Sequence, residues 1–375
     1  MIYLDYSATT PTSYEVLDAI NKTTKEYIGN ANSLNALGRK SSALLNKAVN
    51  QMAEVLMCDS KELTFTSGAT EANNLALIGV AIANLKRGKH IIVSKLEHPS
   101  IYKICDYLKS CGFLIDVVDH DEDGAINIEH LKSLITDETI LVSICAVNSE
   151  LGIRQPLKII KQIIKKENPN TYFHSDITQA LGKIAINMTD LDLASASAHK
   201  IYGPKGIGFL YKKSDVKLDA LIHGSGKTNL LNPGTPPLPL IVGFSKALRL
   251  SQVDLDKRIS YIERLNSKIC SELDNKEGII INKTSYSIPH ILNISFYKIK
   301  PETLVRAMDA EEIYISTNTA CSSGDPSSAV MAIYNDRRRA ESTIRISLSH
   351  LTTLDEVNRF VKYLNNIYDR LNFLI

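Results

Sequence analysis

Between residues 62 and 211, short apolar runs alternate along the chain with longer amphipathic runs. The apolar runs have the length and the β-branched and aromatic content of buried strands. They lie at 62–66, 90–94, 113–118, 140–147, 171–176, 193–198 and 206–211. Helical patterns lie between them at 71–86, 99–110 and 156–167. Such alternation is typical of a mainly parallel sheet between helices. The pattern therefore predicts an α/β fold with a seven-stranded sheet.

The segments outside this region have different patterns. Residues 13–58 have helical spacing apart from a polar loop at 29–35, and a long helical run covers 237–275. The last hundred residues mix strands and helices, with strands at 290–296 and 343–348 and helices at 301–309 and 354–371. We expect two domains. The large one would span 13–255, and a smaller α+β domain would combine 1–12 with 256–375 and carry Cys321.

Composition excludes several classes of protein. The net charge of +2 gives no support for direct nucleic-acid binding. No apolar run is long enough to span a membrane, and the first residues have no secretion-signal pattern. The six cysteines are scattered without a Cys-x-x-Cys pair, which argues against a disulfide framework and against a metal site. We therefore expect a cytoplasmic protein that binds no metal.

The segment 193–206 carries the most chemical information. An apolar strand of small residues leads directly into Ser197, Ala198, His199 and Lys200. In open α/β sheets, ligands bind beyond the carboxyl ends of the strands. A lysine there would lie on the floor of a cleft, where desolvation lowers its pKa and suits it to Schiff-base chemistry. The alternative is a lysine whose head reaches water.

Three other strand ends carry polar residues. Residues 67–70 lie between a strand and a helix, where backbone N–H groups form a phosphate cradle, although Thr70 and Asn73 could instead cap the helix. Asp176 is the last residue of another strand. Its side chain could be a catalytic group, a helix cap or the partner of a ring nitrogen. His98 follows a third strand, where its ring can stack on a flat cofactor, move a proton, or simply form hydrogen bonds within a loop.

Two residues of the C-terminal part are further candidates. Cys321 stands among small polar residues in a segment that resembles an exposed loop, where a thiol can act as a nucleophile. Arg345 lies inside a strand-like run, where it needs an anion. That anion is either a bound carboxylate or a structural ion-pair partner.

Together these stretches resemble the cysteine desulfurases of the NifS/IscS type. These belong to the class V aminotransferase group of fold-type I pyridoxal-phosphate enzymes. The resemblance covers nearly the whole chain, and the order and spacing of its motifs fit that family. The motifs are YLDYSATTP, FTSGATEANNLAL, EHPS, VNSELGIRQP, HSDITQALGK, SAHKIYGPKGIG, PHILNISF, ACSSG and STIRISL.

The resemblance implies pyridoxal 5'-phosphate as the cofactor. Lys200 would form the Schiff base, Asp176 would pair with the ring nitrogen, Gln179 would bond to the phenolic oxygen and His98 would stack on the ring. The phosphate would be held by Ala69, Thr70, Ser197 and His199, and by Thr235 of a neighbouring subunit, which implies a homodimer.

The resemblance also implies the reaction. Asn148 and Arg345 would bind the carboxylate of L-cysteine, and Cys321 would take the sulfur as a persulfide, leaving alanine. The sulfur would pass to an acceptor protein, either an iron–sulfur scaffold or a tRNA-thiolation protein.

The loop at 224–235, GSGKTNLLNPGT, departs from the family pattern. Its GSGKT begins like part of a P-loop, but Leu221 stands where a P-loop needs glycine, and the prolines that follow argue against a helix. The family loop usually reads GGGQERGLRSGT. Lys227 therefore stands for glutamine and Asn232 for arginine. This change leaves open a selenocysteine lyase or cysteine sulfinate desulfinase, or a partner-dependent sulfur-relay subunit.

Overall fold

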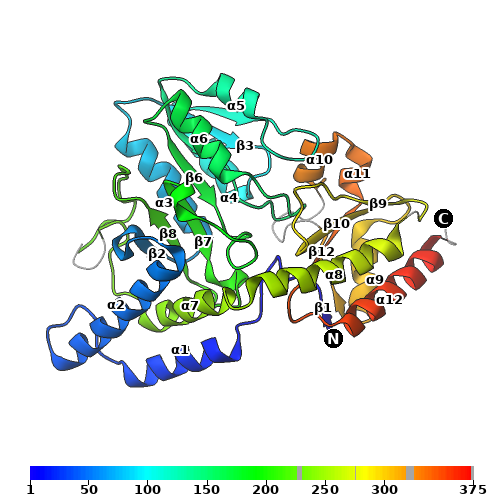
Figure 1. The fold of residues 1–375 in the computed structure, drawn as a ribbon, viewed down its shortest axis with the longest axis horizontal. Coiled ribbons are helices and arrows are strands. Elements are labelled where there is room, and N and C mark those ends of the chain that lie inside the picture. Colours follow the sequence, from blue (N-terminus) through cyan, green and yellow to red (C-terminus); the bar gives the residue numbers. More distant parts are fainter. Residues whose placement is uncertain (226–229, 275, 318–324, 373–375) are drawn as a thin grey trace.

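The computed structural model describes residues 1–225, 230–274, 276–317 and 325–372 (Figure 1). All seven predicted strands are confirmed, and they form one sheet in the order β2-β8-β7-β6-β5-β3-β4. The strands are β2 (Leu63–Thr66), β3 (His90–Ser94), β4 (Leu114–Val118), β5 (Thr139–Ser143), β6 (Tyr172–Asp176), β7 (Leu193–Ser197) and β8 (Gly208–Lys212). Strand β8 runs in the direction opposite to the other six strands of this sheet, so the prediction of a mainly parallel sheet is confirmed.

Helices cover both faces of the sheet. Apolar residues of α3 (Ala69–Ala83) and α4 (Pro99–Ser110) pack against one face. The other face is covered by α2 (Ala36–Leu56), α5 (Ile128–Leu134), α6 (Leu157–Glu167) and α7 (Leu238–Ser251). Strands β3, β5 and β7 are buried along their whole length, which explains why they read as continuous apolar runs.

The helical run predicted at 237–275 is two helices rather than one. Helix α7 ends at Ser251 and α8 (Leu255–Leu273) begins after Asp254, whose φ of 52° is left-handed. A right-handed helix cannot continue through that conformation. At the other end of the chain, α2 follows α1 (Tyr14–Glu26), as the sequence predicts.

The remaining elements form a smaller α+β unit. Its three-stranded sheet contains β9 (Ile279–Ile281), β10 (Ile291–Phe296) and β12 (Thr343–Ser347), and β1 (Ile2–Tyr3) pairs with β11 (Ile313–Tyr314). Its helices are α8, α9 (Pro301–Asp309), α10 (Ser328–Tyr334), α11 (Arg337–Glu341) and α12 (Leu354–Asn372).

This smaller unit has an apolar core of its own. That core draws on residues 2–4 and 262–368, and the predicted division into two domains stays a prediction. Figure 1 shows the N-terminus beside α12, from where the chain crosses to α1 under the large sheet.

Within the described ranges, no helix combines the length and the apolar character that a membrane crossing requires. The same ranges contain no group of three or more His, Cys, Asp or Glu side chains placed to hold a metal ion.

Candidate active site

A cavity of about 570 Å³ lies at the carboxyl ends of the parallel strands. Its volume is in the range of small-ligand sites. Nine of the residues predicted for the site line it, although they come from distant parts of the chain. They are Ala69, Thr70, His98, Asp176, Gln179, Ser197, His199, Lys200 and Arg345.

Lys200 follows β7 in a short 3-10 turn (Ala198–Lys200) and lines the cavity. Its Nζ donates to the carbonyl oxygens of Ser7 at 2.7 Å and Ala8 at 2.5 Å. Two residues on, Tyr202 has a left-handed φ of 64°, and its N–H donates to Thr10 Oγ1. The N-terminal segment therefore wraps the lysine and holds its head at the cavity, which is the position expected for a cleft lysine.

The start of α3 lies at the cavity, where the sequence predicts a phosphate cradle. Gly68 occupies the N-cap position, and the N–H of Ala69 donates to Ser197 Oγ at 2.7 Å. A Cβ on Gly208 would lie 2.4 Å from Ala196 O and 2.7 Å from the backbone of Gly68, so only glycine allows β8 to pass this close to the helix start. The first-turn N–H groups and the Ser197 hydroxyl together suit a phosphate group.

His199 stands beside this cradle. Its Nδ1 lies 3.1 Å from Thr9 Oγ1. Burial, reinforced by the charges of Lys200, Lys205 and Lys183, lowers the pKa of His199 to about 4. The ring is therefore neutral near pH 7 and can donate or accept a hydrogen bond.

Asp176, at the end of β6, is buried, and both of its oxygens accept hydrogen bonds. Oδ1 accepts from the N–H of Thr178 and Oδ2 from Asn73 Nδ2, each at 2.9 Å. Each carboxylate oxygen has a second lone pair, so Asp176 can still accept from a ring N–H in the cavity. Asp176 therefore caps the turn that follows β6 and also lines the cavity, so the capping role does not exclude a role in the site.

Asn73 has a different role from the helix cap that the sequence suggested. It lies in the second turn of α3, is fully buried, and donates to both Asp176 and Ser100 Oγ. Sequence reasoning missed this contact because the two residues are 103 positions apart. The available signal was a polar residue on the buried face of an otherwise apolar helix.

His98 is the N-cap of α4. Its Nδ1 accepts a hydrogen bond from the backbone N–H of Ser100 at 3.1 Å, which places the proton of a neutral ring on Nε2. Burial lowers the pKa of His98, so the ring is neutral near pH 7. A neutral aromatic ring lining the cavity suits stacking on a flat cofactor.

Beside His98, Glu97 is a buried acid behind the cavity. Its Oε1 accepts from Ser94 Oγ at 2.5 Å and from the N–H of Cys145 at 2.7 Å. Burial raises the pKa of Glu97 from 4.5 to about 8, so the group is mostly protonated at pH 7.

This pKa predicts the pH dependence of a Glu97→Gln variant. Between pH 4.5 and 8 the unfolded chain has lost the Glu97 proton while the folded protein retains it, so this group lowers stability as the pH rises. Glutamine does not titrate in this pH range, so its contribution to stability does not change with pH. The variant should melt close to wild type at pH 5 and at least about 2 °C above it at pH 9. Melting curves at both pH values test this, and an equal difference at both would contradict it.

Arg345 reaches the cavity from β12. It is fully buried; its Nη2 lies 2.8 Å from Asp5 Oδ1 and its Nη1 donates to Ser149 O at 3.2 Å. The structural ion pair that the sequence left open is therefore present. Because Arg345 also lines the cavity, binding of a carboxylate there remains a prediction.

Asn148, the other residue predicted to bind substrate, does not line this cavity. It is buried, its Oδ1 accepts from the N–H groups of Glu150 and Leu151, and its Nδ2 donates to Leu96 O. These bonds hold the turn that follows β5. The Asn148 side chain therefore stabilises this turn, a role that the sequence motif did not indicate.

The departing loop lies at the edge of the site. Asn232 Nδ2 donates to Phe65 O and to Glu71 Oε1, and Glu71 also accepts from Ser67 at the cradle. Thr235 is exposed and lies outside the cavity, and its Oγ1 accepts a hydrogen bond from Asn30 Nδ2 at 3.4 Å. Its predicted contact with a neighbouring subunit stays a prediction, and Lys227 lies outside the described residues.

Cys321 also lies outside the described residues. The residues on either side of it are placed. Ser316 exchanges two backbone hydrogen bonds with Arg345, and Ser327 Oγ donates to Glu150 Oε2. The described residues on the two sides of Cys321 therefore contact Arg345, which lines the cavity, and Glu150, whose neighbour Ser149 lines it.

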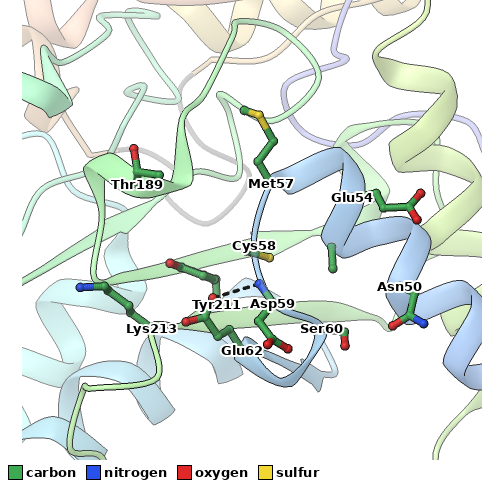
Figure 2. Close-up of a pocket in the computed structure, with 11 residues that line it drawn as sticks. Asn50, Glu54, Met57, Cys58, Asp59, Ser60, Glu62, Thr189, Tyr211 and Lys213 are labelled. Atoms are coloured by element: carbon green, nitrogen blue, oxygen red, sulfur yellow. Dashed lines mark hydrogen bonds between the residues drawn. The ribbon is translucent and has the colours of Figure 1, made fainter.

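A second hollow lies between α2 and β8, away from this site (Figure 2). The N–H of Asp59 donates to Glu62 Oε2 there, as part of a capping box. Burial raises the pKa of Cys58 to about 12, so its thiol stays protonated. None of the residues predicted for the active site lines this hollow.

Comparison of the sequence and the fold with known proteins identifies the family of this chain. The aminotransferase class-V family model matches residues 2–360. Cysteine desulfurase IscS of Buchnera aphidicola subsp. Schizaphis graminum is 39% identical over 383 residues, which cover 100% of this chain and 94% of that protein. A NifS-like protein of known structure has a TM-score of 0.93 at 36% identity, covering 98% of this chain and 99% of its own. SspA in complex with cysteine has a TM-score of 0.82 at 30% identity, covering 94% and 100%.

Proposed function

The chain belongs to the aminotransferase class-V family and is a cysteine desulfurase of the NifS/IscS type, and from this premise we propose how its own residues carry out the reaction. The observation that carries the proposal is the cavity in which Lys200, Asp176, His98 and Arg345 meet. Its substrate would be L-cysteine, as the cysteine complex of the SspA relative suggests.

The residues of the cavity fit pyridoxal 5'-phosphate. The glycine-lined start of α3 suits the phosphate group, and Ala69, Thr70, Ser197 and His199 would hold it. His98 would lie on the ring face, Asp176 would accept from the ring nitrogen and Gln179 would donate to the phenolic oxygen. When bound, the cofactor supplies an electron sink that makes loss of the α-proton of an amino acid feasible.

The protein groups would then act in order. Arg345 would exchange Asp5 for the substrate carboxylate, which orients the amino acid in the cavity. Lys200 would hold the cofactor at the floor of the cavity, and its Nζ, once free, would take the α-proton of the substrate. Ser7 and Ala8 hold that Nζ at the cavity before the reaction.

Cys321 would accept the sulfur. Its thiolate would form a bond to the substrate sulfur while the C–S bond of cysteine breaks, which leaves a persulfide on Cys321. The electron pair of the C–S bond would go to the β-carbon, and protonation of the β- and α-carbons would yield alanine. Cys321 lies five positions after Ser316 in the sequence, a reach of at most roughly 18 Å for extended chain. The acceptor would be an iron–sulfur scaffold or a tRNA-thiolation protein, and the enzyme would act as a cytoplasmic homodimer.

The test is release of alanine and sulfide from L-cysteine by the protein loaded with pyridoxal phosphate, in the presence of a thiol. Wild type should form alanine, and Cys321→Ala should form at least about tenfold less while retaining its yellow colour, since only the sulfur acceptor is removed. Equal alanine from both would remove Cys321 from the proposal. A yellow wild type that makes alanine only from selenocysteine or cysteine sulfinate would replace the proposed substrate.

A further inference from the structure

Lys183 is a buried lysine that lies beneath the cavity without lining it. It is 8% exposed, and its Nζ donates to Gln179 Oε1 at 2.5 Å. Burial lowers the pKa of Lys183 to about 7, with Lys200 and Arg345 adding to the effect. Such a group is costly to keep inside a protein, so its contact with a cavity residue calls for a functional account.

The Gln179 amide is fixed at both ends. Its Nε2 donates to the carbonyl oxygen of Ser7 at 2.9 Å, while its Oε1 accepts from Lys183. A carbonyl oxygen only accepts and a protonated amine only donates, so one orientation of the amide satisfies both partners when Lys183 is protonated. Turning the amide over would set its oxygen against Ser7 O and its NH₂ against Lys183.

The same Ser7 carbonyl also accepts from Lys200 Nζ at 2.7 Å. A single row of hydrogen bonds therefore joins Lys183, Gln179, Ser7 and Lys200. Gln179 lines the cavity, and its Nε2 has a second hydrogen beyond the one that Ser7 accepts.

We propose that Lys183 is a positioning residue that orients the Gln179 amide so that an N–H, and not the carbonyl, meets the phenolic oxygen of the bound cofactor. This inference rests on the proposed cofactor site. Without Lys183 the amide keeps only Ser7 O to distinguish its two ends, so its orientation is held less firmly, and a carbonyl turned toward the phenolic oxygen would repel it.

The charges around Lys183 set the direction of the expected effect. The titratable and charged groups that face it are Lys200, His199, His290 and Arg345. All are cationic or neutral, so Lys183 adds to a positive field at the Lys200 nitrogen. Removing it takes away a positive charge, and it also weakens a hydrogen bond that stabilises a deprotonated phenolic oxygen. Both changes favour protonation of the nitrogen that joins Lys200 to the cofactor.

The test is the pH midpoint of the visible band of the bound cofactor, recorded without substrate. Lys183→Met should raise this midpoint by roughly one unit and should weaken cofactor binding to the cofactor-free protein. Lys161→Met is the matched control, because Lys161 is also mostly buried and paired, but with Asp192 on another face. The control should leave the midpoint unchanged.

A double-mutant comparison separates positioning from charge. If Lys183 acts through Gln179, Lys183→Met should shift the midpoint less than half as much in a Gln179→Ala background. Lys183→Gln keeps an N–H donor without the charge and should shift it less than Lys183→Met, and it serves if the methionine variant does not fold. An unchanged midpoint, or an equal shift in both backgrounds, overturns the inference. A wild type without a visible band would instead overturn the proposed cofactor site.

Discussion

Lys200→Ala should lower desulfurase activity by roughly a thousandfold or more, as removal of a covalent catalytic group does in other enzymes. The reason is that no other residue lining the described cavity is placed as Lys200 is, with its Nζ at the end of β7 and held by Ser7 and Ala8. The measurement is alanine formation, combined with the protein mass after borohydride reduction. Wild type should retain the mass of the cofactor and the variant should not.

Lys200→Arg separates the covalent role from a structural one. Arginine keeps the positive charge and the donors that the carbonyls of Ser7 and Ala8 accept, but it does not form the Schiff base. It should therefore keep the melting temperature near that of wild type while losing activity as the alanine variant does. Activity within about tenfold of wild type in the arginine variant would contradict the assignment of Lys200.

The sequence predicted those parts of the molecule that depend on local pattern. The seven strands are predictable because buried strands read as short apolar runs, and Lys200, Asp176 and His98 are candidates because each lies at or just beyond the end of such a run. Parallel strands bring their carboxyl ends to one edge, so these residues meet without any further information. The break between α7 and α8 was missed because it depends on the backbone angle of Asp254.

The contacts behind the site could not be predicted in the same way. The bond from Asn73 to Asp176 joins an inward-facing helix position to a strand end, and only the packed structure brings them together. Lys183 follows Gln179 by four residues, but its burial and the charges of Arg345 and His290 near it are visible only in the packed structure. The turn that the Asn148 amide holds is likewise visible only in the structure, and substrate binding by Asn148 stays a prediction.

Asp176→Asn should lower activity by roughly a thousandfold, about 4 kcal/mol of transition-state stabilisation. The carboxylate would keep the ring nitrogen protonated, and a protonated ring is the stronger electron sink. Asparagine keeps the size and one acceptor oxygen but removes the negative charge. The measurement is kcat for alanine formation at saturating cysteine, with the cofactor content of each preparation determined separately.

The fold should tolerate this substitution because Asn73 can adapt to it. Asn73 Oδ1 is buried without a hydrogen-bond partner among the described residues, whereas Asn73 Nδ2 donates to Asp176. If the Asn73 amide turns over, its oxygen faces the new NH₂ group, so the hydrogen bond between the two side chains is kept while the Asn73 NH₂ takes the position without a partner. We therefore expect a small change in melting temperature beside a large loss of kcat. A melting temperature that falls sharply, with activity per folded molecule unchanged, would make Asp176 a structural residue only.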